Sequence, residues 1–416
     1  MITIIDAVMG SGKTTYVLNE IERRTREDIS AGPFLYVSPM LSEVGDPSAK
    51  STANKRGRIG RACPAAGFFQ PKDGEGKTKS EDLEYLLAGG DNVACTHKLY
   101  ELLTPTSLEL IRGVGYEVII DEALGAVSAY ETLGTGDEEI IGKLIMINEN
   151  GLVVWCDEKL KYSRYKDVYE KYQKSSLYLI NGKFILIELP PELLRGAKSV
   201  TICTYMFESS VMALWLQKNK LEYQYADNLV LGLRDELEIL EEAKKLITFV
   251  EAPSIQKGSY SNLGMTKRGN LKKIGTNLRG VLRRQFPEAY SSKNYIWTCT
   301  QEFEKQLRPD GGKDLWVASN TRATNDYGDK ELGVFLKDTY PLVPVKAFFK
   351  FYGLELSDDL YALSELIQWT WRLRIRNGQP IILIIGSKRM QTLMERWLNG
   401  EFTEVKNSRP NLKLAV

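Results

Sequence analysis

Residues 2–15 read Ile2-Thr3-Ile4-Ile5-Asp6-Ala7-Val8-Met9-Gly10-Ser11-Gly12-Lys13-Thr14-Thr15. The apolar run at the start predicts a short buried strand, and the residues from Thr14 to about Arg24 predict a helix. Between them, residues 7–14 fit the broad phosphate-binding pattern of Ala or Gly, four residues, then Gly-Lys-Ser/Thr. Because this motif requires a strand, a glycine-rich loop and a helix in that order, the stretch predicts a parallel α/β fold with a nucleotide phosphate site.

The residue types in the loop indicate how ATP and Mg²⁺ would be held. Gly10 and Gly12 let the backbone curl so that successive N–H groups point at phosphate oxygens, and the helix N-terminus adds its dipole. Lys13 would reach the β- and γ-phosphates, and the Thr14 hydroxyl would ligate Mg²⁺. The predicted nucleotide-binding residues of this loop are Met9, Gly10, Ser11, Gly12, Lys13, Thr14 and Thr15.

Length and composition set broad limits on the class of protein. The chain has 416 residues, a net charge of +1, 43% hydrophobic residues, five scattered cysteines and one histidine. We expect about two or three domains at this length. The N-terminus leads straight into a strand and no apolar run approaches about 20 residues, so neither a signal peptide nor a membrane span is expected. The expected location is the cytoplasm, inside the host cell if the protein is encoded by a phage.

The alternation of strand-like and helix-like segments predicts two α/β lobes with parallel sheets. The first lobe is predicted over residues 1–215, with an insertion at about 130–197, and the second over 225–416. Residues 47–80 are rich in Lys, Arg, Gly and Pro and are interpreted as a long surface loop. First-lobe strands are expected near Ile2–Ile5, Phe34–Val37, Asn92–Thr96, Glu117–Ile120 and Ser199–Thr204. Second-lobe strands are expected at Asn294–Cys299, Leu315–Ala318 and Ile381–Ile385, with helices at Tyr361–Arg372 and Lys388–Trp397.

A second acidic motif completes the predicted ATP site. Residues 117–123 read Glu117-Val118-Ile119-Ile120-Asp121-Glu122-Ala123, a buried strand that ends in two acids. Asp121 would hold the Mg²⁺ water shell, and Glu122 would orient and deprotonate the attacking water. Such a strand end is also common as a simple lead into a helix cap, but it follows the phosphate loop by roughly 100 residues in the same predicted sheet.

Gly-Ser-Gly-Lys-Thr together with Asp-Glu-Ala-Leu resembles the DEAD/DEAH-like helicase ATPases of superfamily 2, in a compact form typical of bacteriophage replication or recombination helicases. Further segments fall in the family's order. They are Leu35-Tyr36-Val37-Ser38-Pro39, Ala94-Cys95-Thr96-His97, Thr201-Ile202-Cys203-Thr204-Tyr205, Asn294-Tyr295-Ile296-Trp297-Thr298, Ser319-Asn320-Thr321-Arg322-Ala323-Thr324-Asn325 and Gln368-Trp369-Thr370-Trp371-Arg372-Leu373-Arg374-Ile375-Arg376.

The resemblance implies two tandem RecA-like lobes with ATP in the cleft between them. It implies that Gln368 contacts the nucleotide and that a second-lobe arginine acts as a finger on the γ-phosphate. Arg372 keeps the family's spacing from Gln368, but Trp371 replaces the usual glycine, so Arg374 and Arg376 stay open as alternatives, and Arg376 is included with Arg372 as a catalytic candidate. The residues implied to contact nucleic acid are Ser38, Pro39, Thr96, His97, Thr321 and Arg322.

A basic stretch gives a further nucleic-acid candidate. No acidic residue occurs from Ala252 to Pro287, and this stretch contains Lys267, Arg268, Lys272 and Lys273 among Gly, Ser and Asn. Lysines and arginines among small residues suit close approach to a phosphate backbone, although a solvated loop has the same composition. The predicted partners are single-stranded or forked DNA, with RNA possible, and replication or recombination proteins.

These observations favour a nucleic-acid-dependent ATPase that acts as a DNA helicase or translocase. The alternative is a viral DNA-packaging, terminase-like ATPase, whose nuclease half would need clustered metal-binding acids; Asp310, Asp314, Asp326 and Asp329 are available. A small-molecule kinase and a protein that uses ATP only as a binding switch are further interpretations. The second α/β set and the basic stretch argue against the kinase.

Overall fold

The computed structural model describes residues 1–416 except 29, 47–48, 50–51, 75, 133–144, 157–165, 183, 257–259, 261–269, 320–325 and 404–416. The N-terminal half, residues 1–235, is built on a six-stranded parallel sheet with the order β11-β1-β10-β4-β2-β3. Its strands are β1 (Ile2–Asp6), β2 (Phe34–Ser38), β3 (Val93–Thr96), β4 (Glu117–Asp121), β10 (Ser199–Thr204) and β11 (Tyr223–Tyr225).

Helices cover both faces of this sheet because its strands are apolar on both faces. Alternate residues of one strand enter different cores: Ile4 belongs to one hydrophobic cluster and Ile5 to the other, as the two-residue period of a strand requires. The helices are α1 (Lys13–Glu27), α2 (Leu41–Val44), α3 (Thr52–Ala62), α4 (Lys79–Gly89), α5 (His97–Tyr100), α6 (Pro105–Val114), α9 (Glu192–Arg195) and α10 (Val211–Lys218), with the 3-10 turn η2 (Phe207–Ser209).

An antiparallel region interrupts the parallel sheet between β4 and β10. It contains the sheet β5-β9-β8, formed by β5 (Val127–Thr132), β9 (Phe184–Glu188) and β8 (Ser176–Ile180), and the hairpin of β6 (Ile145–Ile147) and β7 (Val153–Trp155). Helix α8 (Lys166–Tyr172) presents Tyr169 and Tyr172 to Trp155, at ring-centroid distances of 5.3 and 6.1 Å. These two tyrosines therefore pack within the antiparallel region.

The C-terminal half, from residue 236 on, has a four-stranded parallel sheet with the order β12-β15-β14-β13. Its strands are β12 (Ile247–Phe249), β13 (Tyr295–Cys299), β14 (Leu332–Leu336) and β15 (Ile381–Ile385). The helices around it are α11 (Glu236–Leu246), α12 (Pro253–Gln256), α14 (Asn270–Gln285), α15 (Pro287–Ser291), α16 (Glu304–Leu307), α17 (Val343–Phe351), α18 (Asp358–Thr370) and α19 (Lys388–Leu398), with the 3-10 turns η3 (Gln301–Phe303), η4 (Lys313–Leu315) and η5 (Arg374–Asn377).

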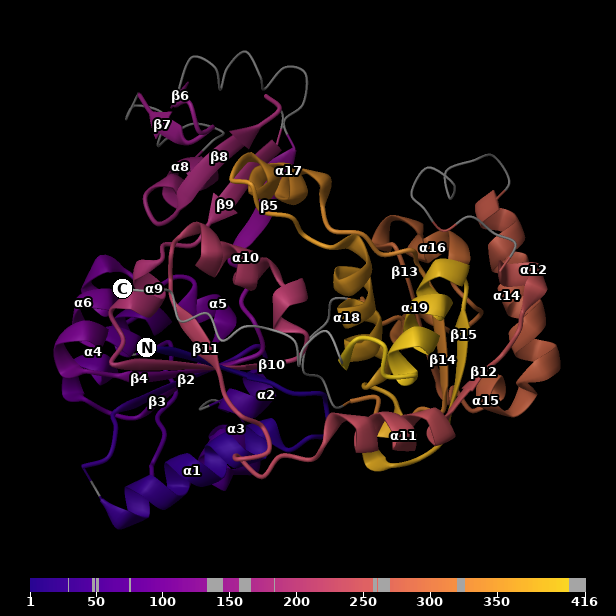
Figure 1. Ribbon diagram of the computed structural model, residues 1–416, viewed down its shortest axis with the longest axis horizontal. Helices are drawn as coiled ribbons and strands as arrows, with labels where there is room; N and C mark the ends of the chain where they lie inside the picture. Colours follow the sequence, from indigo (N-terminus) through magenta and orange to yellow (C-terminus); the bar gives the residue numbers. More distant parts are fainter. Residues whose placement is uncertain are drawn as a thin grey trace.

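The two parallel sheets share an order. In the N-terminal half the four strands β1, β2, β4 and β10 lie as β1-β10-β4-β2, which is first, fourth, third, second along the chain. The strands β12 to β15 lie in the same first, fourth, third, second order. The protein is thus a mixed α/β chain with two parallel sheets that lie side by side (Figure 1).

Helix α17 belongs to the C-terminal half in sequence but packs on the antiparallel sheet of the N-terminal half (Figure 1). Phe348 is 1% exposed and its ring lies 4.8 Å from that of Tyr178 on β8. Beside them, the ammonium of Lys218 bonds the buried carboxylate of Glu188 at 2.8 Å. The packing of Phe348 against Tyr178 joins the two halves on the side of the molecule that carries the antiparallel region.

Two predictions about local structure are wrong. Residues 47–80 are not one long loop, because helix α3 forms within them. Leu315–Ala318 is not a strand: its first residue ends η4, and its backbone makes only an isolated bridge between Trp316 and Trp297. The helix expected at Tyr361–Arg372 forms as α18 and ends at Thr370. No helix in the described part of the chain is long and apolar enough to cross a membrane.

Candidate nucleotide site

The phosphate loop lies at the carboxyl end of β1, where it leads into α1. Gly10 and Gly12 have φ of 84° and 97°, a left-handed backbone that glycine adopts without a steric penalty. Lys13 begins α1 and is only 6% exposed, so its side chain faces a cavity and not bulk water. The cavity has a volume of about 320 Å³. Its lining comprises Met9, Gly10, Gly12, Lys13, Thr14, Thr15, Glu43, Arg58, Asp121, Glu122, Gln368, Trp371, Arg372 and Arg376.

Ser11 is the one predicted loop residue that does not line this cavity. It is 3% exposed, and its backbone shapes the loop: its N–H donates to the Val8 carbonyl at 3.2 Å, and its carbonyl accepts from Arg234 N–H at 3.1 Å. The structure therefore gives Ser11 a place within the loop, packed against the segment that follows β11.

Asp121 ends β4 beside the start of α1. The Thr14 hydroxyl donates to an Asp121 carboxylate oxygen at 3.3 Å, although β10 separates β1 from β4 in the sheet. Asp121 is 8% exposed. Burial, and then the neighbouring Glu122, raise the pKa of the Asp121 carboxyl to about 7, while Lys13 acts in the opposite direction. A hydroxyl and a desolvated carboxylate side by side form a hard oxygen donor pair that a divalent cation would stabilise.

Glu122 follows Asp121 in an unusual backbone conformation. Its φ is 68°, in the left-handed region that residues with a side chain rarely occupy. Its N–H donates to the Cys203 carbonyl of β10 at 2.7 Å, which helps to hold this conformation. Glu122 lines both the nucleotide cavity and a neighbouring cavity of about 280 Å³ between the two halves. Strained backbone of this kind is retained where the placement of a side chain matters.

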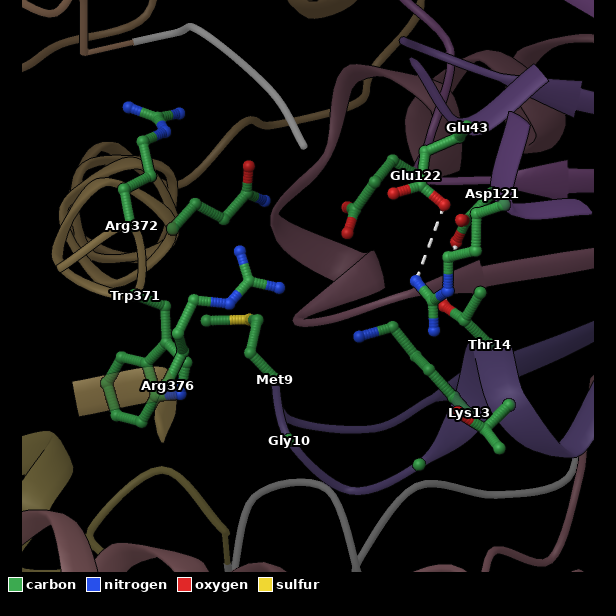
Figure 2. A pocket seen from close by; sticks show the side chains of 14 residues that line it. Met9, Gly10, Lys13, Thr14, Glu43, Asp121, Glu122, Trp371, Arg372 and Arg376 are labelled. Carbon is green, nitrogen blue, oxygen red and sulfur yellow. Dashed lines mark hydrogen bonds and ion pairs between the residues drawn. The ribbon is translucent and has the colours of Figure 1, made fainter. Parts of the chain in front are cut away.

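The second wall of the cavity comes from α18 and the turn after it. Trp371 is 8% exposed and packs edge-on against Trp397 of α19 at 5.3 Å. In Figure 2 the Arg376 side chain extends into the cavity toward the N-terminal half, whereas the Arg372 guanidinium points away from Lys13. Partial desolvation, and then the like charge of Arg58, lower the pKa of Arg376.

The Arg372 guanidinium is hydrogen-bonded to backbone carbonyls. The residue is 3% exposed, and its guanidinium donates to the Ala318 carbonyl at 3.2 Å and to the Ser319 carbonyl at 3.5 Å. The preference for Arg372 as the finger, drawn from its spacing to Gln368, therefore does not agree with this conformation. The helix ends at Thr370, so the residues after it no longer follow helical spacing.

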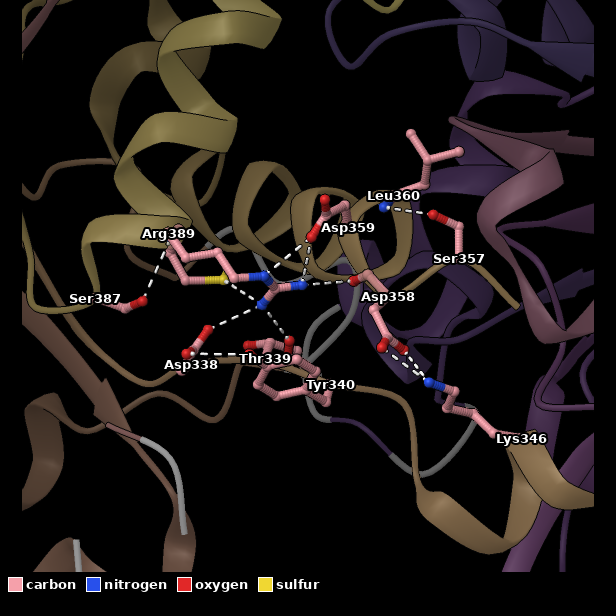
Figure 3. Close-up of polar contacts among 11 residues, drawn as sticks. Asp338, Thr339, Tyr340, Lys346, Ser357, Asp358, Asp359, Leu360, Ser387 and Arg389 are labelled. Atoms are coloured by element: carbon pink, nitrogen blue, oxygen red, sulfur yellow. Dashed lines mark hydrogen bonds and ion pairs between the residues drawn. The ribbon is translucent and has the colours of Figure 1, made fainter. Parts of the chain in front are cut away.

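A polar network holds this wall in place (Figure 3). Arg389 of α19 donates to the Asp338 carboxylate at 2.9 Å, to the Thr339 carbonyl at 3.0 Å and to the Asp359 carboxylate at 3.0 Å. Its guanidinium also lies 4.3 Å from the ring centre of Tyr340. The network ties the start of α18 and the segment after β14 to α19, and α18 in turn carries Gln368.

Three cavity residues, Glu43, Arg58 and Trp371, were not among the predicted site residues. Glu43 of α2 is 7% exposed, and Arg58 of α3 pairs with it at 3.4 Å; the dashed line at Glu43 in Figure 2 marks this pair. Both follow β2 within or beside the segment that was interpreted as a surface loop. An isolated glutamate and an arginine among several basic residues give no motif, so only the fold reveals that they share the site.

The residues predicted to contact nucleic acid at the ends of β2 and β3 differ in their exposure and in their distance from the site. His97 lies beside the site, with Nε2 2.8 Å from the Asp121 carbonyl, and Thr96 caps α5, its hydroxyl accepting from Leu99 N–H. Pro39 is half-buried. Ser38 is fully buried at 0% exposure, so the expectation that it contacts nucleic acid is not met in this conformation.

The remaining predicted contacts lie far from the cavity or outside the described residues. Lys272 and Lys273 are exposed on α14, on the outer side of the second sheet (Figure 1). Lys267, Arg268, Thr321 and Arg322 lie outside the described residues. Within the described part of the chain, no group of three or more His, Cys, Asp or Glu side chains is placed to hold a metal ion.

Comparison with known proteins corrects the family assignment. Residues 235–398 match the family model of the YonV C-terminal Rossmann-like domain. The chain is also similar to the SPbeta prophage-derived uncharacterized protein YonV of Bacillus subtilis (strain 168), with 27% identity over 425 residues, covering 96% of this chain and 99% of that protein. No DEAD/DEAH-like helicase family matches, so the resemblance to that family is wrong. Its two specific motifs are the phosphate loop and the paired acids, which many nucleotide-binding proteins share. The chain thus has a Rossmann-like C-terminal domain and resembles a prophage protein along almost its whole length.

Proposed function

We propose that this protein is a Mg²⁺-dependent ATPase whose active site lies between two RecA-like lobes. The observation that carries the proposal is the composition of one cavity. It brings together Lys13, Thr14, Asp121 and Glu122 from the N-terminal half with Gln368 and Arg376 from the C-terminal half. The shared strand order of the two sheets supports the proposal that both halves are lobes of one kind.

Each of these four residues of the N-terminal half has a role in this scheme. The backbone of the phosphate loop and Lys13 bind the β- and γ-phosphates. Thr14 and Asp121 would hold Mg²⁺, and their adjacent oxygens fit a cation that keeps most of its water ligands. When bound, the ion supplies positive charge that offsets the charge of the phosphates. Glu122 orients a water molecule and accepts its proton as the water oxygen bonds to the γ-phosphorus and the bond to the ADP oxygen breaks.

Arg376 supplies the contact from the C-terminal half. Its side chain extends into the cavity, whereas Arg372 donates to backbone carbonyls. An arginine at this place would stabilise charge on the transferring phosphate when the halves approach one another. Hydrolysis would thereby depend on the relative position of the two lobes.

We further propose that this dependence couples hydrolysis to movement along nucleic acid, as in a DNA helicase or translocase. Single-stranded or forked DNA is the expected partner, and RNA is possible. In the described part of the chain, support comes from the exposed Lys272 and Lys273 on α14 and from Thr96 and His97 beside the site. The terminase-like alternative would need a nuclease centre, and no group of acids among the described residues favours it.

Replacement of Lys13 tests the ATPase proposal. Lys13→Ala removes the charge that would contact the β- and γ-phosphates, so phosphate release from MgATP should be nearly abolished while circular dichroism stays unchanged. Lys245→Ala is a matched control, because this lysine is exposed on α11 and lines none of the cavities described above. Full turnover by a folded Lys13→Ala protein would refute the proposal.

The nucleic-acid part has its own test. The double variant Lys272→Ala/Lys273→Ala should weaken binding to single-stranded DNA of any sequence. The slope of log affinity against log salt should also decrease by roughly one unit for each phosphate that the variant no longer neutralises. An unchanged slope would assign these lysines to a solvated helix face.

A further inference from the structure

Glu43 and Arg58 form an ion pair inside the nucleotide cavity that has no part in the scheme above. Arg58 adds a basic side chain to the cavity wall besides Lys13 and Arg376. Its side chain is 40% exposed, whereas that of Glu43 is 9% exposed, so the carboxylate is fixed and the guanidinium reaches solvent in the cavity.

The backbone is shaped to bring these two residues together. Gly57, directly before Arg58, has φ of 60°, and a Cβ at this position would lie 2.4 Å from the Glu43 carbonyl oxygen and 2.4 Å from the Gly45 nitrogen. Only glycine permits this approach of α3 to α2. The position of Arg58 against Glu43 is therefore built into the fold and does not depend on the ion pair alone.

The ion pair itself is weak. The distance from Arg58 Nη1 to Glu43 Oε2 is 3.4 Å, longer than the roughly 2.7–2.9 Å of a good charge-assisted hydrogen bond. Arg58 also acts on groups on both sides of the cavity: its charge opposes the rise in the pKa of Asp121 in the N-terminal half and, after desolvation, contributes to the lowered pKa of Arg376 in the C-terminal half. The cavity lining thus holds three acids, Glu43, Asp121 and Glu122, and the basic side chains of Lys13, Arg58 and Arg376, which are the groups able to meet a highly charged anion.

We propose that Arg58 contacts the terminal phosphate of a bound nucleoside triphosphate, and that Glu43 holds this arginine when the nucleotide is a diphosphate. The inference rests on the proposed ATP site and deepens it, because it makes the Glu43–Arg58 pair the element that distinguishes ATP from ADP. A guanidinium suits this role, since its planar fork can bond two phosphate oxygens at once.

Exchange of Arg58 between two acceptors is physically reasonable here. Glu43 and Asp121 are acids of like charge, and Glu43 raises the pKa of the Asp121 carboxyl. When Arg58 leaves Glu43, a cation held by Asp121 would offset the charge of both acids. The contact with Glu43 reduces the fraction of molecules in which Arg58 can meet the phosphate, and the apparent affinity for a triphosphate falls by that fraction. Glu43 therefore sets how strongly the site prefers ATP.

The test compares the affinities of the full chain for ADP and for the non-hydrolysable analogue adenylyl imidodiphosphate, both with Mg²⁺. Arg58→Ala should weaken binding of the analogue by about 10- to 100-fold and change ADP affinity less than about twofold. Glu43→Gln should strengthen binding of the analogue relative to ADP, because it removes the competing charge. Arg56→Ala is the matched control, an exposed arginine on the same helix that does not line the cavity.

The outcomes separate this inference from the proposed function. A wild-type protein that hydrolyses ATP, with Arg58→Ala leaving the ratio of the two affinities unchanged, would overturn the inference and leave the ATPase proposal standing. A wild-type protein that binds neither nucleotide would overturn both. If Arg58→Ala does not fold, Arg58→Lys replaces it, because lysine keeps the charge but cannot bond two phosphate oxygens at once. If Arg58→Lys and Glu43→Gln, measured as separate variants, both leave the ratio of analogue affinity to ADP affinity unchanged, the role of Arg58 is refuted.

Discussion

Arg372 and Arg376 stand four residues apart, and the structure predicts opposite consequences when each is replaced by alanine. Arg372 donates to the Ala318 and Ser319 carbonyls and is 3% exposed. Arg372→Ala leaves these carbonyls without their charged donor, and a decrease of about 2–4 kcal/mol in unfolding free energy is expected. Arg376 is exposed and points into the cavity, so Arg376→Ala should lower the unfolding free energy by less than Arg372→Ala does.

In activity the two variants should differ in the opposite direction, with the larger loss in Arg376→Ala. If Arg376 contacts the transferring phosphate, Arg376→Ala should lower kcat by ~10³-fold, equivalent to about 4 kcal/mol of transition-state stabilisation. Stability is followed by urea unfolding monitored through tryptophan fluorescence, to which Trp369, Trp371 and Trp397 of the cluster around the Arg372 segment contribute. Activity is followed by phosphate release. A kcat unchanged in Arg376→Ala and abolished in a stably folded Arg372→Ala would refute the assignment of roles.

Three further predictions concern the structure around the site. The hydrogen bond from Arg24 is the main cause that lowers the pKa of Glu117 to about 2. A lowered pKa stabilises the fold only while the carboxyl is ionised, so Glu117→Gln should lower the unfolding free energy by about 1–2 kcal/mol at pH 7. In urea unfolding, the difference between this variant and wild type should shrink as the pH falls from about 4.5 toward 2. Arg389→Ala should destabilise the C-terminal half by about 2–3 kcal/mol, and Arg389→Lys should recover little, because a lysine cannot reproduce the branched contacts; equal stability of all three proteins would contradict this. Phe348→Ala should cost about 3–5 kcal/mol and speed hydrogen exchange in β8 and β9, and unchanged exchange there would show that α17 does not secure the two halves.

Much of the sheet framework could be predicted from the sequence. The boundaries of β10 and β15 agree with the predicted Ser199–Thr204 and Ile381–Ile385. β15 is a continuous apolar run, as buried parallel strands often are, and β10 is rich in β-branched residues. The phosphate loop and the Asp121–Glu122 pair also lie together as expected. Both follow strands of one parallel sheet, and the carboxyl ends of such strands meet at one edge.

The remaining features depend on contacts between distant segments. Helix α3 was missed because Gly57 interrupts its pattern with a left-handed backbone, and a glycine in a basic segment is normally typical of a loop. Glu43 and Arg58 enter the site only through that close approach. The packing of α17 on the antiparallel region could not be predicted from local sequence patterns either, because Phe348 and Tyr178 are 170 positions apart in the chain. Arg372 was preferred for the family's spacing from Gln368, but α18 ends at Thr370, so that spacing does not fix where the arginines after the helix point.

The central claim, that the cavity between the two halves hydrolyses ATP, is tested most directly through Glu122. Glu122→Gln keeps the shape of the side chain and removes its ability to accept a proton from water. Phosphate release from MgATP is measured for the wild-type and variant proteins, with binding of MgATP measured in parallel. The account predicts that both proteins bind ATP and that the variant turns it over at least ~10²-fold more slowly. Equal rates in the two proteins, or ATP binding without any phosphate release by the wild type in the presence and absence of single-stranded DNA, would contradict it.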